Sequence, residues 1–139
     1  MAAFNKVYAF IESIAEKVFN LGSDQLKVAL TNTAPTTATT TYASLTAPLA
    51  TTNLSGATPF NVTTSTSAQT TGTYKLVCAD LVLTATGAVG PFQYVALYDD
   101  TATNKDVIGW FDYGSSISLA NGETFTIDFD GSAGVLTIA

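Results

Sequence analysis

The sequence predicts an all-β fold: an antiparallel sandwich of about eight strands preceded by one N-terminal amphipathic α-helix. Three observations lead to this prediction. Short apolar runs separated by turn residues fill the second half of the chain, and no helical pattern lies between them. Threonine, a β-branched residue suited to strands, accounts for 24 of the 139 residues. The length suits a single domain over residues 1–139.

The N-terminal helix is predicted over residues 3–21, within a segment 1–22. Its apolar side chains share one half of a helical wheel, and Gly22 stands where a terminating glycine is expected. This apolar face is wider than the stripe of roughly 100° that covers one sheet. We expect the helix to dock on its own sandwich and to contact a neighbouring subunit with part of the face, namely Phe4, Tyr8 and Phe19.

The sandwich is predicted over residues 26–139, interrupted by a Thr/Ala-rich region at about 33–72. This region reads as long loops with one or two short strands. It is either a poorly ordered linker or an extended arm that orders on a partner, because loops of this length are commonly disordered or functional. In the second case its contact residues would be Pro35, Tyr42, Pro48 and Pro59.

Eight runs are predicted as strands, and eight strands in two sheets fit a jelly roll. In residues 124–130, Phe125, Ile127 and Phe129 alternate with polar side chains and so should face the interior. Asn121-Gly122 predicts a hairpin between the two strands that flank it. The predicted strands cover residues 26–31, 60–66, 74–84, 92–98, 107–111, 117–119, 124–130 and 135–138.

The charge balance limits the classes of partner. All five basic residues are lysine, against eleven carboxylates, for a net charge of −6. We therefore expect no direct nucleic-acid binding and no adsorption to anionic lipid. No apolar run is long enough to span a membrane, and the N-terminus lacks the pattern of a signal peptide. The chain is thus expected to be synthesised in the cytoplasm, with Cys78 as a buried, inert thiol.

The residue types leave little room for catalysis. The chain has no histidine and no arginine, which removes the usual general base and bidentate anion clamps. It also lacks a Ser-x-x-Lys pair and a glycine-rich phosphate loop. Paired carboxylates, as in glycoside hydrolysis, remain as candidates among Asp112, Glu123, Asp128 and Asp130. Strand alternation already explains two of them as solvated, so we expect no enzyme.

Two further clusters admit a functional and a structural interpretation. Asp99, Asp100, Asn104 and Asp106 could bind a hard cation, but these residue types also form turns and Lys105 lies among them. We expect a turn without metal or cofactor. Six aromatic residues could stack on sugars, but they fall within strands, where we expect core packing. They are Phe92, Tyr94, Tyr98, Trp110, Phe111 and Tyr113.

Three segments, residues 21–35, 71–100 and 107–137, resemble a set of small virion proteins of tailed phages. Within this set the sequence is most similar to capsid decoration (cement) proteins of short-tailed phages with a jelly-roll fold. The resemblance implies a non-enzymatic shell component without cofactor, bound to the major capsid protein on the outside of the virion as a homodimer or homotrimer. The alternative is a structural protein of the tail or head–tail junction, with a receptor- or carbohydrate-binding role.

Overall fold

A computed structural model describes residues 2–139, which form a mostly β structure with antiparallel pairing between all neighbouring strands. The helical elements are α1 (Ala9–Ala15) and a 3₁₀ turn, η1 (Tyr42–Ser44). Within residues 2–139 the strands are β1 (Phe4–Lys6), β2 (Leu26–Thr31), β3 (Asn61–Val62), β4 (Thr64–Thr70), β5 (Thr73–Cys78), β6 (Leu81–Thr84), β7 (Val89–Asp99), β8 (Val107–Leu119), β9 (Thr124–Ile127) and β10 (Leu136–Ile138).

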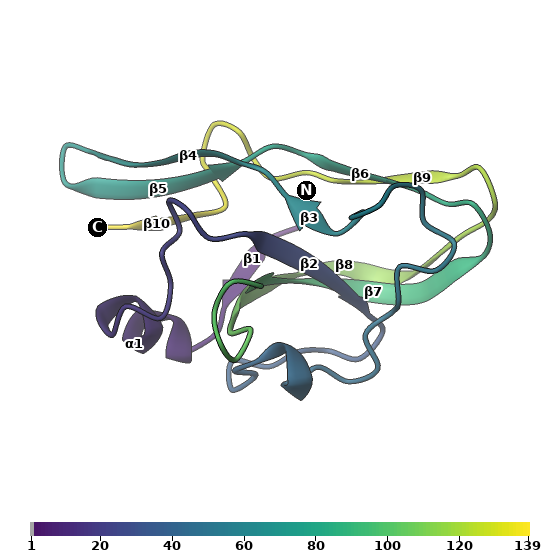
Figure 1. Cartoon of the computed structure of the whole chain (residues 1–139), viewed down its shortest axis with the longest axis horizontal. Coiled ribbons are helices and arrows are strands. Elements are labelled where there is room, and N and C mark those ends of the chain that lie inside the picture. The colour runs from purple at the N-terminus through teal and green to yellow at the C-terminus, as the bar shows by residue number, and fades with distance from the viewer. Residues whose placement is uncertain (1) are drawn as a thin grey trace.

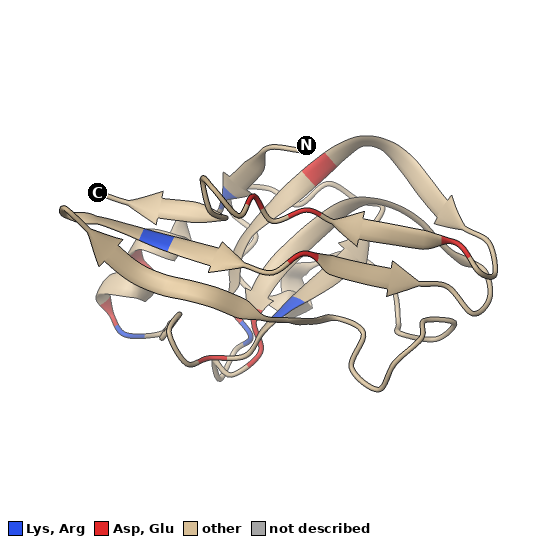
Figure 2. Ribbon diagram, turned by 90° about the horizontal axis from the view of Figure 1, so that it is seen from above, with Lys and Arg blue, Asp and Glu red and all other residues tan. Residues whose placement is uncertain are grey.

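The strands form two layers (Figure 1). One layer is a five-stranded sheet in the order β1-β8-β7-β2-β3. The other consists of a three-stranded sheet, β10-β5-β4, and a two-stranded sheet, β6-β9, which follow one another along the long axis of the molecule. Seen from above, the hairpin of β4 and β5 projects at one end of this second layer (Figure 2). The prediction of a mostly β, antiparallel fold is confirmed.

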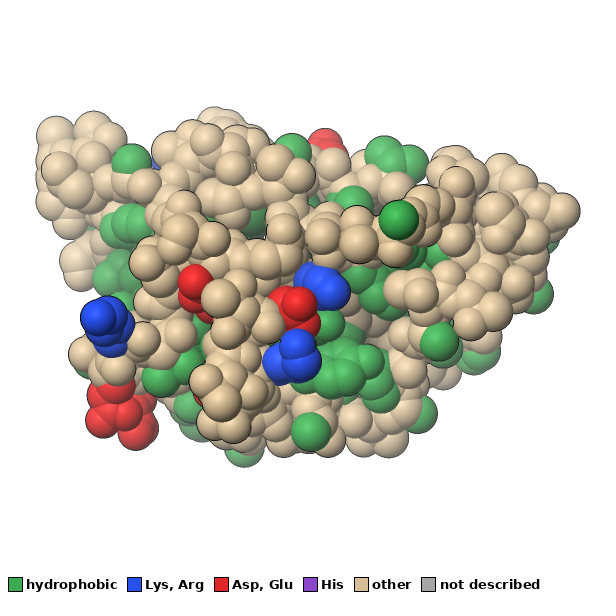
Figure 3. Space-filling model, in the orientation of Figure 1, with side chains coloured by type: hydrophobic (Ala, Val, Ile, Leu, Met, Phe, Trp, Pro, Cys, Tyr) green, Lys and Arg blue, Asp and Glu red, His purple; other side chains and the backbone are tan. Residues whose placement is uncertain are grey.

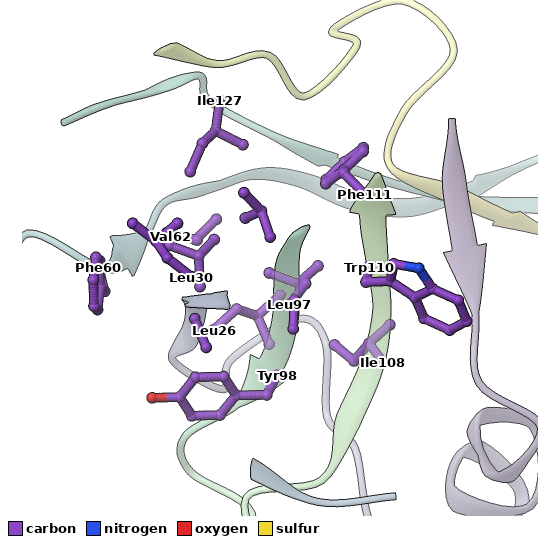
Figure 4. Close-up of a cluster of buried hydrophobic side chains, with 14 of the residues drawn as sticks. Leu26, Leu30, Phe60, Val62, Leu97, Tyr98, Ile108, Trp110, Phe111 and Ile127 are labelled. Carbon is purple, nitrogen blue, oxygen red and sulfur yellow. The ribbon is translucent and has the colours of Figure 1, made fainter. Parts of the chain in front are cut away.

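Much of the hydrophobic core lies between the layers. Figure 4 shows Ile127 of β9 above Leu30 of β2 and Leu97 of β7, and all three side chains are fully buried. Aromatic pairs also bridge the layers, with Phe92 of β7 against Phe125 of β9 at 5.2 Å between ring centroids. Such edge-to-face contacts add to the stabilisation from buried apolar area.

The predicted helix over residues 3–21 is wrong in extent. The helix α1 has seven residues, and Phe4–Lys6 is a strand that pairs with Gly109–Phe111 of β8. Backbone pairing with β8 satisfies the N–H and C=O groups of the first residues, so tertiary context overrides the amphipathic helical pattern.

Gly22 does not terminate the helix either. Lys17 takes the left-handed conformation with φ 64°, two residues after the end of α1. The N–H of Val18 donates to the Ser13 carbonyl (2.8 Å) and that of Lys17 to the Ile14 carbonyl (3.3 Å). This is the Schellman pattern of helix termination, here formed without glycine.

Strand prediction succeeds for 26–31, which is β2, but two other strands have different bounds from those predicted. Tyr113-Gly114-Ser115 lies inside β8, because Tyr94 pairs with Asp112 and Phe92 with Ile117. The turn residues thus form an irregularity within one long strand instead of ending it. The segment 74–84, predicted as one strand, forms two strands instead, because β5 ends at Cys78 and β6 begins at Leu81.

The predicted Asn121-Gly122 hairpin is wrong. A turn does form there, with the Glu123 N–H donating to the Ala120 carbonyl (3.0 Å), but β8 pairs with β7 and β9 pairs with β6. The turn therefore joins the two layers. The N–H of Ala85 donates to the Glu123 carbonyl, which ties the turn to the end of β6.

The Thr/Ala-rich region packs against the chain's own sheet. The Leu49 N–H donates to the Leu30 carbonyl of β2, and the Thr31 hydroxyl donates to the Thr46 carbonyl. Leu45 and Leu54 are buried. The end of the region forms β4, which pairs with β5. The segment is therefore part of the folded chain in this structure.

Gly109 is the point of closest approach between β1 and β8. A Cβ atom there would meet the Asn5 carbonyl oxygen and the Phe4 ring, whose Cζ lies 2.7 Å away. We expect Gly109→Ala to displace β1 and to lower the free energy of unfolding by about 1–3 kcal/mol, as overpacking does. Urea denaturation measures this loss. Gly131→Ala, which introduces no close contact, is the control and should change stability by less than about 0.5 kcal/mol.

Candidate interaction surface

Three of the four candidate catalytic carboxylates hold local structure. Asp112 accepts hydrogen bonds from Gln93 Nε2 and the Gly114 N–H, and these lower the pKa of its carboxyl. Glu123 accepts one from the Ala120 N–H. Asp130 accepts two hydrogen bonds from the N–H groups of residues 132 and 133, which lower the pKa of its carboxyl. Asp128 is exposed.

The alternation predicted for residues 124–130 is confirmed, with Ile127 and Phe129 fully buried.

The loop between β7 and β8 is held by its own side chains. Asp99 is fully buried, and its Oδ1 accepts the N–H groups of Thr101 (2.9 Å) and Ala102 (3.1 Å). Asp100 forms ion pairs with Lys27 (3.3 Å) and Lys105 (2.6 Å), which lower its pKa. Within residues 2–139, no three side chains among His, Cys, Asp and Glu are grouped to hold a metal.

A second carboxylate, Asp24, faces Asp99 beside a cavity of about 400 Å³. Burial, followed by the neighbouring Asp24 carboxyl, raises the pKa of Asp99 to about 7. The Asp99 Oδ2 is buried and has no hydrogen-bond donor. When the Asp99 carboxyl is protonated, this buried group carries no charge and gains a proton that it can donate.

The aromatic residues of β7 and β8 belong to the core. Phe92, Tyr98, Trp110 and Phe111 are buried, and Figure 4 shows Trp110 projecting from β8 towards β1. The prediction of core packing is confirmed for these four. Cys78 is also buried, and burial raises the pKa of its thiol to about 11, so it is a poor nucleophile at neutral pH.

The seven predicted contact residues differ widely in exposure. Tyr8 is exposed, whereas Phe19 and Pro35 are buried within the chain and do not belong to its surface. The remaining four are half-buried: Phe4, Tyr42, Pro48 and Pro59. The structure does not bring the seven together, because Tyr42 contacts Tyr98 while Phe4 contacts Phe111.

Three of the four exposed large apolar side chains among the described residues lie on and next to α1, and the fourth, Val82, lies on β6. Tyr8 is 77% exposed, Ile11 72% and Val18 37%, and we call these three residues the α1 patch. Beside it, Ile11 and Ile14 of α1 and Ile138 of β10 line a groove of about 360 Å³. The opposite side of α1 holds Phe10, which is buried and stacks on Phe19. Exposed apolar groups next to a groove are typical of protein contact surfaces.

Sequence reasoning did not single out Ile11 or Val18. The signal was nevertheless present, because the apolar half of the helical wheel is wider than the stripe that one sheet can cover.

The rest of the surface carries few charges. Figure 3 shows lysines and carboxylates as scattered spots on an otherwise uncharged face.

Comparisons of this chain with protein families, with curated proteins and with solved structures found no significant match. In the part of the chain that the structure describes, no helix has the length and apolar character needed to cross a membrane.

Proposed function

We propose that this chain is a non-enzymatic structural protein of a tailed-phage virion that binds the outside of the capsid lattice and stabilises it. The proposal combines the sequence resemblance with one structural observation, the α1 patch. Its partner is the major capsid protein, and its location is the virion surface after synthesis in the host cytoplasm.

The α1 patch supports this proposal because its exposure is costly in an isolated chain. Tyr8 and Ile11 stand one helical turn apart and are both more than 70% exposed. Fully burying such a side chain contributes roughly 1.5–3 kcal/mol. A decoration protein needs modest contacts of this size, because the lattice repeats each contact many times.

The composition supports the same role. Only 12% of the residues are charged, against about 25% in an ordinary soluble domain. Charged residues are depleted at the centre of protein interfaces, where desolvation penalises them. Catalysis receives no comparable support, because the candidate carboxylates Asp112, Glu123 and Asp130 are bound to local turns.

We further propose that the two layers form a jelly-roll-like sandwich. The support is the path of the chain, which changes layer between β3 and β4, between β6 and β7, and between β8 and β9. Repeated crossing between facing sheets is typical of Greek-key sandwiches, the class that includes jelly rolls.

The copy number of the polypeptide in purified virions tests the location. Quantitative mass spectrometry should give a ratio to the major shell subunit near one, or a simple fraction of one. A handful of copies per particle would contradict the decoration role and indicate the tail or the head–tail junction.

The α1 patch is tested by a paired substitution, Tyr8→Ser with Ile11→Ser. We expect binding to particles that lack the protein to weaken at least tenfold, because two apolar contacts are lost. Co-sedimentation with the particles measures this. Val82→Ser, at an apolar residue of β6 that is 56% exposed, is the matched control and should bind normally. Equal binding by both variants would exclude the patch.

A further inference from the structure

The outer edge of β4 carries unpaired backbone groups. The strand is the last in the order β10-β5-β4, so only its inner side pairs with a neighbour. A two-residue turn, Thr71-Gly72, joins it to β5, with φ values of 50° and 85°. In such a hairpin the flanking pair, Thr70 and Thr73, exchanges hydrogen bonds, and the pattern then alternates along the strand. The N–H and C=O groups of Ser67 and Gln69 therefore point away from β5.

This edge lacks the usual protection against pairing with another strand. Natural edges are short, or carry charges, prolines or bulges. The other edge strands of the described chain have two to four residues, whereas β4 has seven. Residues 63–73 include neither a charge nor a proline. The single bulge, between Thr64 and Thr66, leaves residues 66–70 regular.

The position of β4 leaves this edge accessible. Figure 2 shows the hairpin projecting from the body, with β4 on its outer side and no charged residue along β4. All residues from 66 to 70 are exposed except Ser67, whose hydroxyl bonds to Tyr74 of β5. We call residues 66–70 the β4 edge.

We propose that the β4 edge pairs with the β4 edge of a second copy of this chain, antiparallel about a two-fold axis at Ala68. This dimer is independent of the proposed binding to a capsid. Ser67 then exchanges backbone hydrogen bonds with Gln69 of the second copy, and Gln69 with Ser67, for four in total.

The side chains fit this register. Ala68 lies on the axis, where the two chains are closest, and its small side chain allows that approach. Thr66 faces Thr70 of the second copy, and threonine pairs of this kind are favourable across antiparallel strands. The chain has a net charge of −6, so two copies repel over most of their surfaces, but no carboxylates meet along this uncharged edge. A two-fold contact of one surface with itself is also the commonest form of protein association.

Charge substitutions at positions 66 and 70 test both the dimer and its register. In the variant Thr66→Glu/Thr70→Glu, glutamates face each other across the axis in two places. In Thr66→Lys/Thr70→Glu, each lysine faces a glutamate. The two variants differ only at position 66, and both positions are exposed, so each monomer should fold normally.

Sedimentation equilibrium of the full chain at about 1–100 μM measures the association. We expect the wild type to dimerise in this range, the double-glutamate variant to associate about tenfold more weakly, and the lysine–glutamate variant to recover wild-type association or exceed it. A monomeric wild type at 100 μM would overturn the proposal. So would a dimer that the double-glutamate variant leaves intact, or a failure of the lysine–glutamate variant to recover.

A disulfide cross-link provides a second measurement that does not depend on charge. Cysteines introduced by Ala68→Cys face each other across the axis, within the range of Cα separations that a disulfide spans. Mild oxidation should give a covalent dimer, whereas Thr126→Cys, on the exposed side of β9, should give none above background. The native Cys78 is buried and does not interfere. Equal cross-linking at both positions would contradict the proposed pairing.

Discussion

Phe92→Ala is expected to lower the free energy of unfolding by about 3–5 kcal/mol, a large part of the stability of an ordinary domain. Phe92 is fully buried on β7, and its ring meets that of Phe125 edge to face across the two layers. Truncation removes both the buried area and this contact, and it leaves a cavity that close-packed neighbours fill only in part.

Urea denaturation followed by fluorescence or circular dichroism measures this loss, with ΔG extrapolated linearly to water. Val82→Ala is the control, since that apolar side chain is 56% exposed and should contribute less than about 0.5 kcal/mol. A loss below 1 kcal/mol for Phe92→Ala would mean that the layers are not packed through this ring.

Asp99→Asn is expected to stabilise the protein at pH 8, and its gain over the wild type should be about 3 kcal/mol larger at pH 8 than at pH 4.5. The pKa of Asp99 is about 7 in the folded chain, against an ordinary value of 3.8. The folded state therefore binds more protons than the unfolded state between these values. Stability then falls as the pH rises from about 4 towards 7, because ionised Asp99 is buried beside Asp24.

The substitution by asparagine preserves the local hydrogen bonds. The amide oxygen can accept the N–H groups of Thr101 and Ala102, and the amide nitrogen can donate to Asp24. Only the ionisation is removed, so the variant should show a flatter dependence of stability on pH.

Urea denaturation at several pH values between 4.5 and 8 tests this expectation. Asp112→Asn is the matched control, because the pKa of that exposed carboxyl lies below its usual range and the group stays ionised throughout the window. If wild type and Asp99→Asn show parallel pH profiles, Asp99 does not take up a proton on folding in this range.

The strands were predictable where a local pattern and burial agree. Residues 26–31 carry an apolar run with no helical alternative nearby, and they form β2 as predicted. Phe125, Ile127 and Phe129 alternate with polar residues and face the core, because side chains of a strand point alternately to its two sides. Burial of Cys78 followed from its place within an apolar run.

The candidate surface was predictable only in part. The apolar excess of the N-terminal segment indicated a contact face, and Tyr8 belongs to it. Phe19 does not, because helix termination at Lys17 turns the chain and buries that ring against Phe10. A residue lies on a face of the helix only if the helix extends that far. A helical wheel does not specify where the helix stops.

By itself, the amino-acid sequence determined that the chain is mostly β, that several of its strand aromatics line the core, and that it contains no histidine and no arginine. These properties follow from local periodicity and from residue type. Only the tertiary structure decided that Phe4–Lys6 is a strand, that Asn121-Gly122 joins two layers, and that β4 has a free edge. The physical reason is that strands pair with strands distant in sequence. A local turn or helix signal is overridden wherever such a distant strand satisfies the backbone N–H and C=O groups better.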